Sequence, residues 1–268
     1  MTSAIADAAA TRTASEEQAV RVAVVGAAGR MGQRLVALGE AQAGLEIVGR
    51  YDLDAPVSAA GLRDARCDVL IDFTLPAALP ASLEACRGSG AGLVLGTTGL
   101  DAAALEAVEQ ATADIAVLHA SNFSIVVNVL HHLTRQAVRI LGDGWDREVL
   151  EAHHRYKADA PSGTALALAR TVADAAGLDP ERSICTTRSG ADALRRPDDI
   201  TVQTLRIGDH AGEHTVFLAA PGERLELKHV STSRDSYASG ALRAAAWLGA
   251  RGGRPAGRYD IKEVLGLA

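Results

Sequence analysis

The chain has 268 residues, of which 48% are hydrophobic, 22% charged and 3% aromatic, and its formal net charge is −6 at pH 7. This length and composition are typical of a globular protein with one large domain or two smaller ones. The negative balance and the few aromatic side chains argue against a nucleic-acid partner, which would need a basic surface or stacking platforms.

The three cysteines, Cys67, Cys86 and Cys185, are scattered and form no C-x-x-C motif. Such a set predicts reduced thiols and a cytoplasmic location. Because the sequence has no run of about 18 apolar residues, we expect no membrane span and no membrane partner. Residues 1–19 are rich in Ala, Ser and Thr, with neither the apolar core of a signal peptide nor the basic bias of a transit peptide. They predict a disordered leader.

The first half of the chain alternates between strand and helix patterns. The β-branched apolar run at residues 20–25 ends at Gly26 and is typical of a buried parallel strand. Further strands are predicted at 45–48, 67–73, 92–96 and 115–118, with helices up to about residue 42, at about 77–86, and from a cap at Asp101 to about 112. This alternation predicts an α/β fold, with a Rossmann-like parallel sheet covered by helices on both faces.

The alternation ends near Phe123, where a helix is predicted over 124–140. Strands are expected at 146–153, 200–207, 213–219 and 223–230, helices at 163–176 and 237–248, and a final segment at 258–265. Pro221-Gly222 between the last two strands predicts an antiparallel hairpin. A second α+β domain with a mixed or antiparallel sheet is therefore expected over roughly 125–234.

A glycine cluster lies between the first strand and the first helix, at Gly26, Gly29 and Gly32, although Ala28 replaces the second glycine of the usual fingerprint. Glycines there allow the backbone to approach a pyrophosphate resting on the helix N-terminus. Asp52 ends the second strand, where an acid would hydrogen-bond the adenosine ribose. The alternative is a tight turn that serves packing only. The context favours a dinucleotide site.

The residues around Asp52 bear on the choice between NADH and NADPH. A 2′-phosphate needs a guanidinium close by, and Leu53 follows the acid instead. Arg50 is near, but the sequence does not fix the direction of its side chain. The pattern favours NADH.

Polar loops follow two more predicted strands, Gly96-Thr97-Thr98-Gly99 and Ala120-Ser121-Asn122-Phe123. Both lie at carboxyl ends of strands, where open α/β sheets bind ligands. Each could instead be an ordinary loop with an Asn or Thr cap.

The stretch 153–164 concentrates cations beside a helix start. His153 and His154 alternate in direction on a strand, so both can face one ligand only if the strand ends there. Free amides at the Ser162-Gly163-Thr164 helix start could bind one carboxylate, while Lys157 and a histidine bind another or deliver a proton. This suits a small dicarboxylate beside a nicotinamide. The alternative is one structural histidine with solvated cations.

Metal and serine-hydrolase chemistry are not predicted. His131 and His132 are adjacent on a helix and point apart, while His210 and His214 span a glycine-containing segment expected to turn. The sequence suggests no third ligand, so no metal site is expected. A G-x-S-x-G elbow is also missing from the sequence.

Several blocks resemble the 4-hydroxy-tetrahydrodipicolinate reductase family of the diaminopimelate and lysine pathway. They are residues 24–32, 72–74, 96–99, 121–124, 151–164, 212–215, 233–234 and 240–242. The resemblance covers the chain after residue 20, and the block 151–164 is its most specific part. It implies reduction of 4-hydroxy-tetrahydrodipicolinate to tetrahydrodipicolinate with NADH or NADPH.

The resemblance also implies roles for individual residues. His153 resembles the proton donor or acceptor of the family and Lys157 its second catalytic group, while His154, Gly163 and Thr164 resemble the ligands of the substrate carboxylates. The matching cofactor contacts are Gly26, Ala27, Ala28, Gly29, Arg30, Met31, Asp52, Gly96, Thr97, Thr98, Ala120, Ser121, Asn122 and Phe123.

At the level of domains, the resemblance implies a dinucleotide-binding domain over 20–124 plus 235–268. It further implies a substrate-binding and oligomerisation domain over 125–234, and a homotetramer. Three residues depart from patterns seen in family members. They are Tyr156, where members often have His, and Leu53 and Leu75, where some carry a basic residue.

Two other functions remain open. A non-catalytic dinucleotide sensor would bind NAD without turnover. A reductase of another small amino or keto acid, such as an aspartate or homoserine dehydrogenase, would be favoured if the helix start at Ser162 did not face the nicotinamide.

Overall fold

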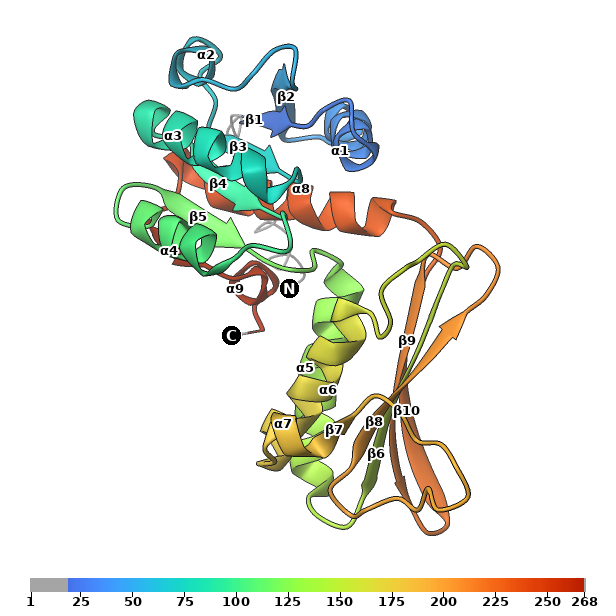
Figure 1. Cartoon of the computed structure of the whole chain (residues 1–268). Helices are drawn as coiled ribbons and strands as arrows, with labels where there is room; N and C mark the ends of the chain where they lie inside the picture. The colour runs from blue at the N-terminus through green and yellow to red at the C-terminus, as the bar shows by residue number, and fades with distance from the viewer. Residues whose placement is uncertain (1–18, 268) are drawn as a thin grey trace, which may run out of the picture.

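The structure is a computed structural model that describes residues 19–267. The leader predicted over 1–19 lies outside the described residues except for Ala19. Two sheets form two units, joined by the chain around residues 120–124 and 232–235 (Figure 1). This arrangement confirms the predicted fold class, a parallel α/β sheet followed by a smaller α+β unit.

The first sheet has six parallel strands in the order β11-β5-β4-β3-β1-β2. These strands are β1 (Val20–Val25), β2 (Leu45–Tyr51), β3 (Val69–Asp72), β4 (Gly92–Leu95), β5 (Ala116–His119) and β11 (Gly257–Tyr259). Strands one to five were predicted. The three-residue β11 was not, because its pairing with β5 and not its own sequence makes it a strand.

Successive side chains on these strands enter two different cores. Val22 and Val24 pack with α1 (Arg30–Ala41), α8 (Asp235–Gly249) and α9 (Ile261–Leu265). Ala23 and Val25 pack on the opposite face, which is covered by α2 (Ala59–Asp64), α3 (Leu79–Ser89) and α4 (Ala102–Ala111). Strand side chains alternate between faces, so apolar residues at nearly every strand position bury both. Short 3₁₀ turns at Pro76–Ala78 and Ala250–Gly252 complete this unit.

The second sheet is mixed, in the order β10-β9-β6-β8-β7. Its strands are β6 (Asp146–His153), β7 (Ile184–Cys185), β8 (Ile200–Arg206), β9 (Gly212–Ala220) and β10 (Glu223–Ser231). β6 pairs parallel with β8 and antiparallel with β9, and β9 and β10 form the predicted hairpin around Pro221-Gly222. The short elements α2, β7 and α7 (Pro180–Ser183) were not predicted.

Helices cover one face of the second sheet. α5 (Ile125–Leu141) and α6 (Gly163–Ala176) bury Leu130 and Leu168 against Val149, Val202 and Val216. Figure 1 shows these helices on one side of the sheet and no element on the other, within the described chain. Among residues 19–267, no helix is long and apolar enough to cross a membrane.

Candidate active site

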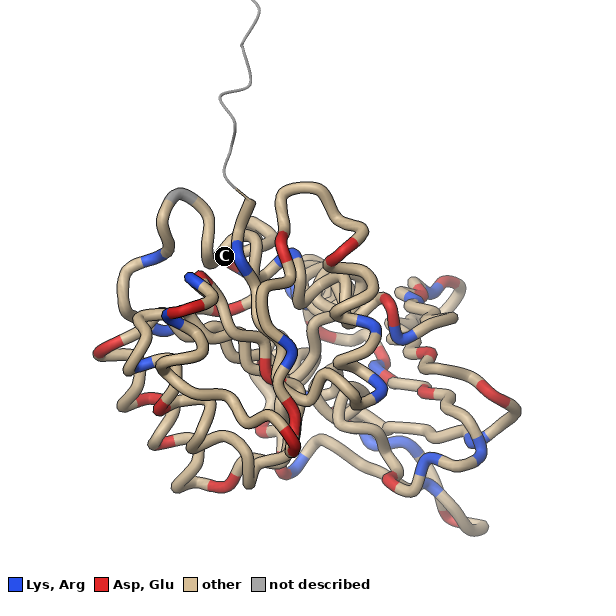
Figure 2. Tube along the Cα trace, turned by 90° about the horizontal axis from the view of Figure 1, so that it is seen from above, with Lys and Arg blue, Asp and Glu red and all other residues tan. Residues whose placement is uncertain are grey.

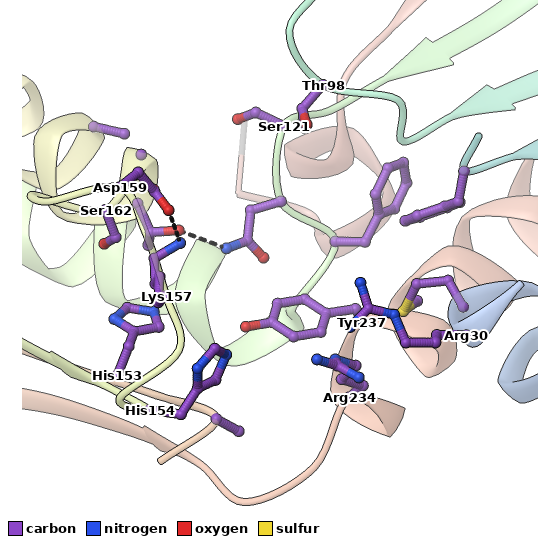
Figure 3. A pocket seen from close by; sticks show the side chains of 18 of the residues that line it. Arg30, Thr98, Ser121, His153, His154, Lys157, Asp159, Ser162, Arg234 and Tyr237 are labelled. Carbon is purple, nitrogen blue, oxygen red and sulfur yellow. Dashed lines mark hydrogen bonds and ion pairs between the residues drawn. The ribbon is translucent and has the colours of Figure 1, made fainter. Parts of the chain in front are cut away.

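A cleft of about 610 Å³ lies between the two units. One side is lined by side chains from the start of α1 and from the loops after β3, β4 and β5, which we call the nucleotide-side loops (Figure 3). The other side is lined by the end of β6, the start of α6 and the residues around the start of α8. Basic and acidic residues intermingle along the described trace (Figure 2), so an anion site in this protein has to be local.

The β1–α1 loop is shaped by backbone contacts. Gly26 has a φ of 71°, which favours glycine. A Cβ on Gly32 would lie 2.0 Å from the Gly26 carbonyl oxygen, so α1 approaches the loop too closely for a side chain. Asp52 accepts a hydrogen bond from the Ala28 amide at 2.8 Å. That bond and a second from the Leu53 amide lower the pKa of Asp52.

A buried carboxylate ties the loops after β3 and β4 together. Asp72 accepts hydrogen bonds from the hydroxyls of Thr74 at 2.6 Å, Ser82 at 2.6 Å and Thr97 at 3.2 Å. The Thr97 hydroxyl is therefore turned into the protein, while Thr98 lines the cleft. No local sequence pattern indicates this use of Asp72, because its partners lie up to 25 residues away.

The loop after β5 reaches across to the second unit. Asn122 accepts from the Ser124 amide at 2.8 Å and donates through Nδ2 to the Thr164 hydroxyl at 3.1 Å. Phe123 contacts the Phe73 ring at a centroid distance of 5.2 Å. A Cβ on Gly240 of α8 would lie 1.8 Å from the Phe123 carbonyl oxygen, so α8 packs directly on this loop.

Both His153 and His154 line the cleft because β6 ends at His153. His153 Nδ1 is hydrogen-bonded to the buried Glu151 carboxylate. Burial lowers the pKa of His153, and Glu151 opposes that shift. Lys157 forms an ion pair with Asp159 at 2.8 Å, which lowers the pKa of Asp159 (Figure 3).

The start of α6 offers free donors to the same cleft. Ser162 caps the helix through its hydroxyl, which accepts from the Ala165 amide at 3.2 Å. Gly163 and Thr164 line the cleft, and within residues 19–267 their amides have no protein acceptor. A helix N-terminus with free N–H groups is a site for a carboxylate.

The cleft brings together eleven of the predicted site residues. They are Arg30, Met31, Thr98, Ser121, Asn122, Phe123, His153, His154, Lys157, Gly163 and Thr164. The other predicted cofactor residues do not line it, namely Gly26, Ala27, Ala28, Gly29, Asp52, Gly96, Thr97 and Ala120. Gly26 to Gly29 lead directly into Arg30 in the β1–α1 loop, and Asp52, just after β2, contacts this loop through its hydrogen bond with the Ala28 amide.

Sequence reasoning gave no role to Arg234 and Tyr237, which lie opposite the histidines in Figure 3. The only sequence feature that pointed to them is the Ser233-Arg234 pair just before a predicted helix. His131 also lines the cleft, where its Nδ1 lies 2.8 Å from the Thr171 hydroxyl and burial lowers its pKa to about 4. No group of three metal-ligating side chains occurs in the described chain.

Comparisons with known proteins cover nearly the whole chain. The family profile for the dihydrodipicolinate reductase N-terminus matches residues 20–123, and that for its C-terminus matches 126–265. A 4-hydroxy-tetrahydrodipicolinate reductase of Alkalilimnicola ehrlichii is 45% identical, covering 92% of this chain and 99% of the relative. One from an Anaeromyxobacter species is also 45% identical, covering 92% and 98%.

Solved structures share the fold. A dipicolinate-bound dihydrodipicolinate reductase from Paenisporosarcina superposes with a TM-score of 0.70 at 20% identity, covering 92% of this chain and 99% of the other. An engineered D-amino acid dehydrogenase bound to NADP⁺ superposes with a TM-score of 0.53 at 16% identity, covering 92% and 94%. At these identities the likeness concerns the fold alone.

Proposed function

The chain belongs to the dihydrodipicolinate reductase family, and we propose that its reaction takes place in the cleft between the end of β6 and the nucleotide-side loops. The protein is an NAD(P)H-dependent oxidoreductase that reduces 4-hydroxy-tetrahydrodipicolinate to tetrahydrodipicolinate, in diaminopimelate and lysine biosynthesis. The observation that carries the placement is that the free amides of Gly163 and Thr164 share one cleft with Lys157 and His153.

The nucleotide side fits a dinucleotide. The β1–α1 loop and the start of α1 meet without an intervening side chain at Gly32, so bare backbone at a helix N-terminus is presented to a phosphate. The bound cofactor supplies the hydride. In our proposal the binding residues are Gly26 to Met31, Asp52, Gly96 to Thr98 and Ala120 to Phe123. NADH is the preferred form, since Leu53 beside Asp52 is 95% exposed and offers no cation to a 2′-phosphate.

The substrate side fits a small dicarboxylate. One carboxylate would accept hydrogen bonds from the Gly163 and Thr164 amides, and the second would lie near His154. Lys157 and His153 would hold or deliver protons at the ring as hydride arrives and water leaves. The Paenisporosarcina relative, whose bound ligand is a planar dicarboxylate, supports this choice of ligand.

A reductase of another small amino or keto acid would be favoured by a helix start that did not face the nicotinamide. The start of α6 instead lies in the cleft that Thr98, Ser121 and Asn122 line from the nucleotide side. The Asn122–Thr164 hydrogen bond at 3.1 Å links the two sides directly. This geometry favours a dicarboxylate held against the cofactor.

We further propose that residues 20–124 plus 235–268 bind the dinucleotide, and that 125–234 bind substrate and form a homotetramer. The helix-free face of the second sheet supports this interface, since Leu205 and Val230, which point to that face, are 42% and 50% exposed. A cytoplasmic location is supported by Cys67, Cys86 and Cys185, which are all free thiols.

The test is transfer of deuterium. The enzyme is incubated with freshly prepared 4-hydroxy-tetrahydrodipicolinate and NADH carrying deuterium at the transferable position, and the product is analysed by mass spectrometry. We expect one deuterium in tetrahydrodipicolinate. Tight NADH binding without deuterated product would contradict the proposal and favour the sensor.

A further inference from the structure

Glu151 lies beneath the catalytic end of β6, and its carboxylate is fully buried. It precedes His153 by two positions, so both side chains point to the same side of the strand. Three donors converge on the carboxylate. Oε1 accepts from the Ser162 amide at 3.1 Å, and Oε2 accepts from Arg206 at 3.0 Å and is bonded to His153 Nδ1.

An ionised carboxylate accepts hydrogen bonds but has no hydrogen to donate. In the Glu151–His153 hydrogen bond, Nδ1 of His153 therefore carries the hydrogen. The remaining ring nitrogen, Nε2, is then free to exchange a proton with a ligand in the cleft. The charged and titratable groups that face His153 are Glu151 on β6, Arg206 on β8, His214 on β9 and Lys157 in the following loop. Of these, only Glu151 favours the protonated ring.

Arg206 supplies the counter-charge that a buried carboxylate requires. It pairs with His153 in the β6–β8 register, and 18% of its side chain is exposed. The same guanidinium donates through Nε to the Lys157 carbonyl at 3.3 Å and through its second terminal nitrogen to the Asp159 carbonyl. One side chain therefore holds both Glu151 and the backbone that carries Lys157.

We propose that Glu151 and Arg206 are positioning residues for this reaction: Glu151 fixes the Nδ1-protonated tautomer of His153, and Arg206 neutralises Glu151 and anchors the Lys157 loop. Neither residue needs to touch substrate. The proposal rests on the proposed function of His153 and Lys157. It adds which residues fix the tautomer of His153 and the position of the loop that carries Lys157.

The test replaces Glu151 with Gln, which keeps the shape and removes the charge. Hydrogen–deuterium exchange at the C2 position of each histidine, followed by mass spectrometry across pH, reports the titration of His153 without reference to activity. We expect the His153 midpoint to fall by about one pH unit. In the pH profile of kcat/KM, the apparent pKa that reports His153 should fall by the same amount. The value of kcat should drop about 10-fold near neutral pH.

Glu148→Gln is the matched control, because Glu148 also lies on β6 and pairs with an arginine, Arg188 at 2.9 Å, on the other side of the strand. It should leave the His153 midpoint and kcat unchanged. Glu151→Asp keeps the charge but moves it away from His153 by the length of one methylene group. If the Glu151→Gln protein does not fold, the His153 midpoint and the kinetics are measured in Glu151→Asp instead. An unchanged His153 midpoint in the Glu151 variants would overturn the proposal.

Two further outcomes separate this proposal from the proposed function. A lowered His153 midpoint with wild-type kinetics would confirm the Glu151–His153 coupling and contradict the catalytic role of His153. Arg206→Lys keeps a cation but cannot make all three contacts, so we expect kcat to fall about 10-fold with KM for the substrate unchanged. Wild-type kcat in this variant would overturn the role of Arg206.

Discussion

The two sides of the cleft are held in different ways. On the nucleotide side, backbone and small residues make the shape, as at Gly26 and Gly32. On the β6 side, charged side chains make the site, and they depend on a buried ion pair between Glu151 and Arg206. The first side should therefore be sensitive to added volume, and the second to lost charge.

The largest expected effect concerns charge on the β6 side. Lys157→Ala should lower kcat by about 100-fold or more, because a positioned proton donor or acceptor is lost. NADH affinity should stay at the wild-type level, which fluorescence titration measures. Lys262→Ala is the control, since Lys262 lies on α9, is 45% exposed and pairs with Asp260 at 3.6 Å. Equal kcat in the two variants would remove Lys157 from the mechanism.

The helix start can be tested by removing one donor without disturbing the helix. Gly163 is the first residue of α6, and Ser162 has a ψ of 151°, which suits a following proline. Gly163→Pro should raise KM for the substrate by between about 10-fold and 100-fold and leave NADH affinity unchanged. Ala102→Pro makes the same change at the first residue of α4, outside the cleft, and should leave KM unchanged.

A larger side chain at Gly32 should weaken the binding of the cofactor and leave the binding of the substrate unchanged. A methyl group on Gly32 would overlap the Gly26 carbonyl and lie 2.7 Å from Ala27 Cα, so the loop has to move. Overpacking of this kind costs about 1–3 kcal/mol, and a loss of about 1.4 kcal/mol in cofactor binding corresponds to a rise of about 10-fold in KM for NADH. Gly61→Ala, in α2, is the control, because its nearest neighbours are side-chain hydroxyls at 3.1 Å and 3.3 Å. A rise in KM for the substrate instead would break the distinction between the two sides.

The buried histidines of the β6 side predict a loss of stability in acid. Burial lowers the pKa of His214 to about 3, from an ordinary value of 6.5. The unfolded chain therefore takes up this proton first, and stability falls as pH drops below 6.5. We expect His214 alone to account for the loss of about 1.4 kcal/mol of unfolding free energy per pH unit down to about pH 4. His214→Gln should flatten this dependence in urea unfolding, whereas His210→Gln at a partly exposed site should not.

The smallest expected effect is on cofactor choice. Leu53→Arg places a guanidinium beside Asp52 at an exposed site, where an ion pair contributes up to about 1 kcal/mol. Paired kinetics should show kcat/KM for NADPH rising about 5-fold, with little change for NADH. Leu53→Gln should change neither. A wild-type protein that already prefers NADPH would contradict the proposed preference for NADH.

The same contrast explains what the sequence could predict. Strand ends, glycine spacing and the cap at Ser162 are local, so β1 to β6, α6 and the loops at Thr98 and Ser121 followed from short patterns. The contacts that hold the proposed catalytic groups are not local. Arg206 lies 55 residues from Glu151, and Arg234 and Tyr237 reach the cleft only because the chain returns after the β9–β10 hairpin.

The most direct test of the account is a crystal structure with NADH and dipicolinate bound together. We predict one ligand carboxylate on the Gly163 and Thr164 amides, the second near His154, and the ring between Lys157 and the nicotinamide. A dicarboxylate bound elsewhere, with the α6 amides facing solvent, would contradict the account.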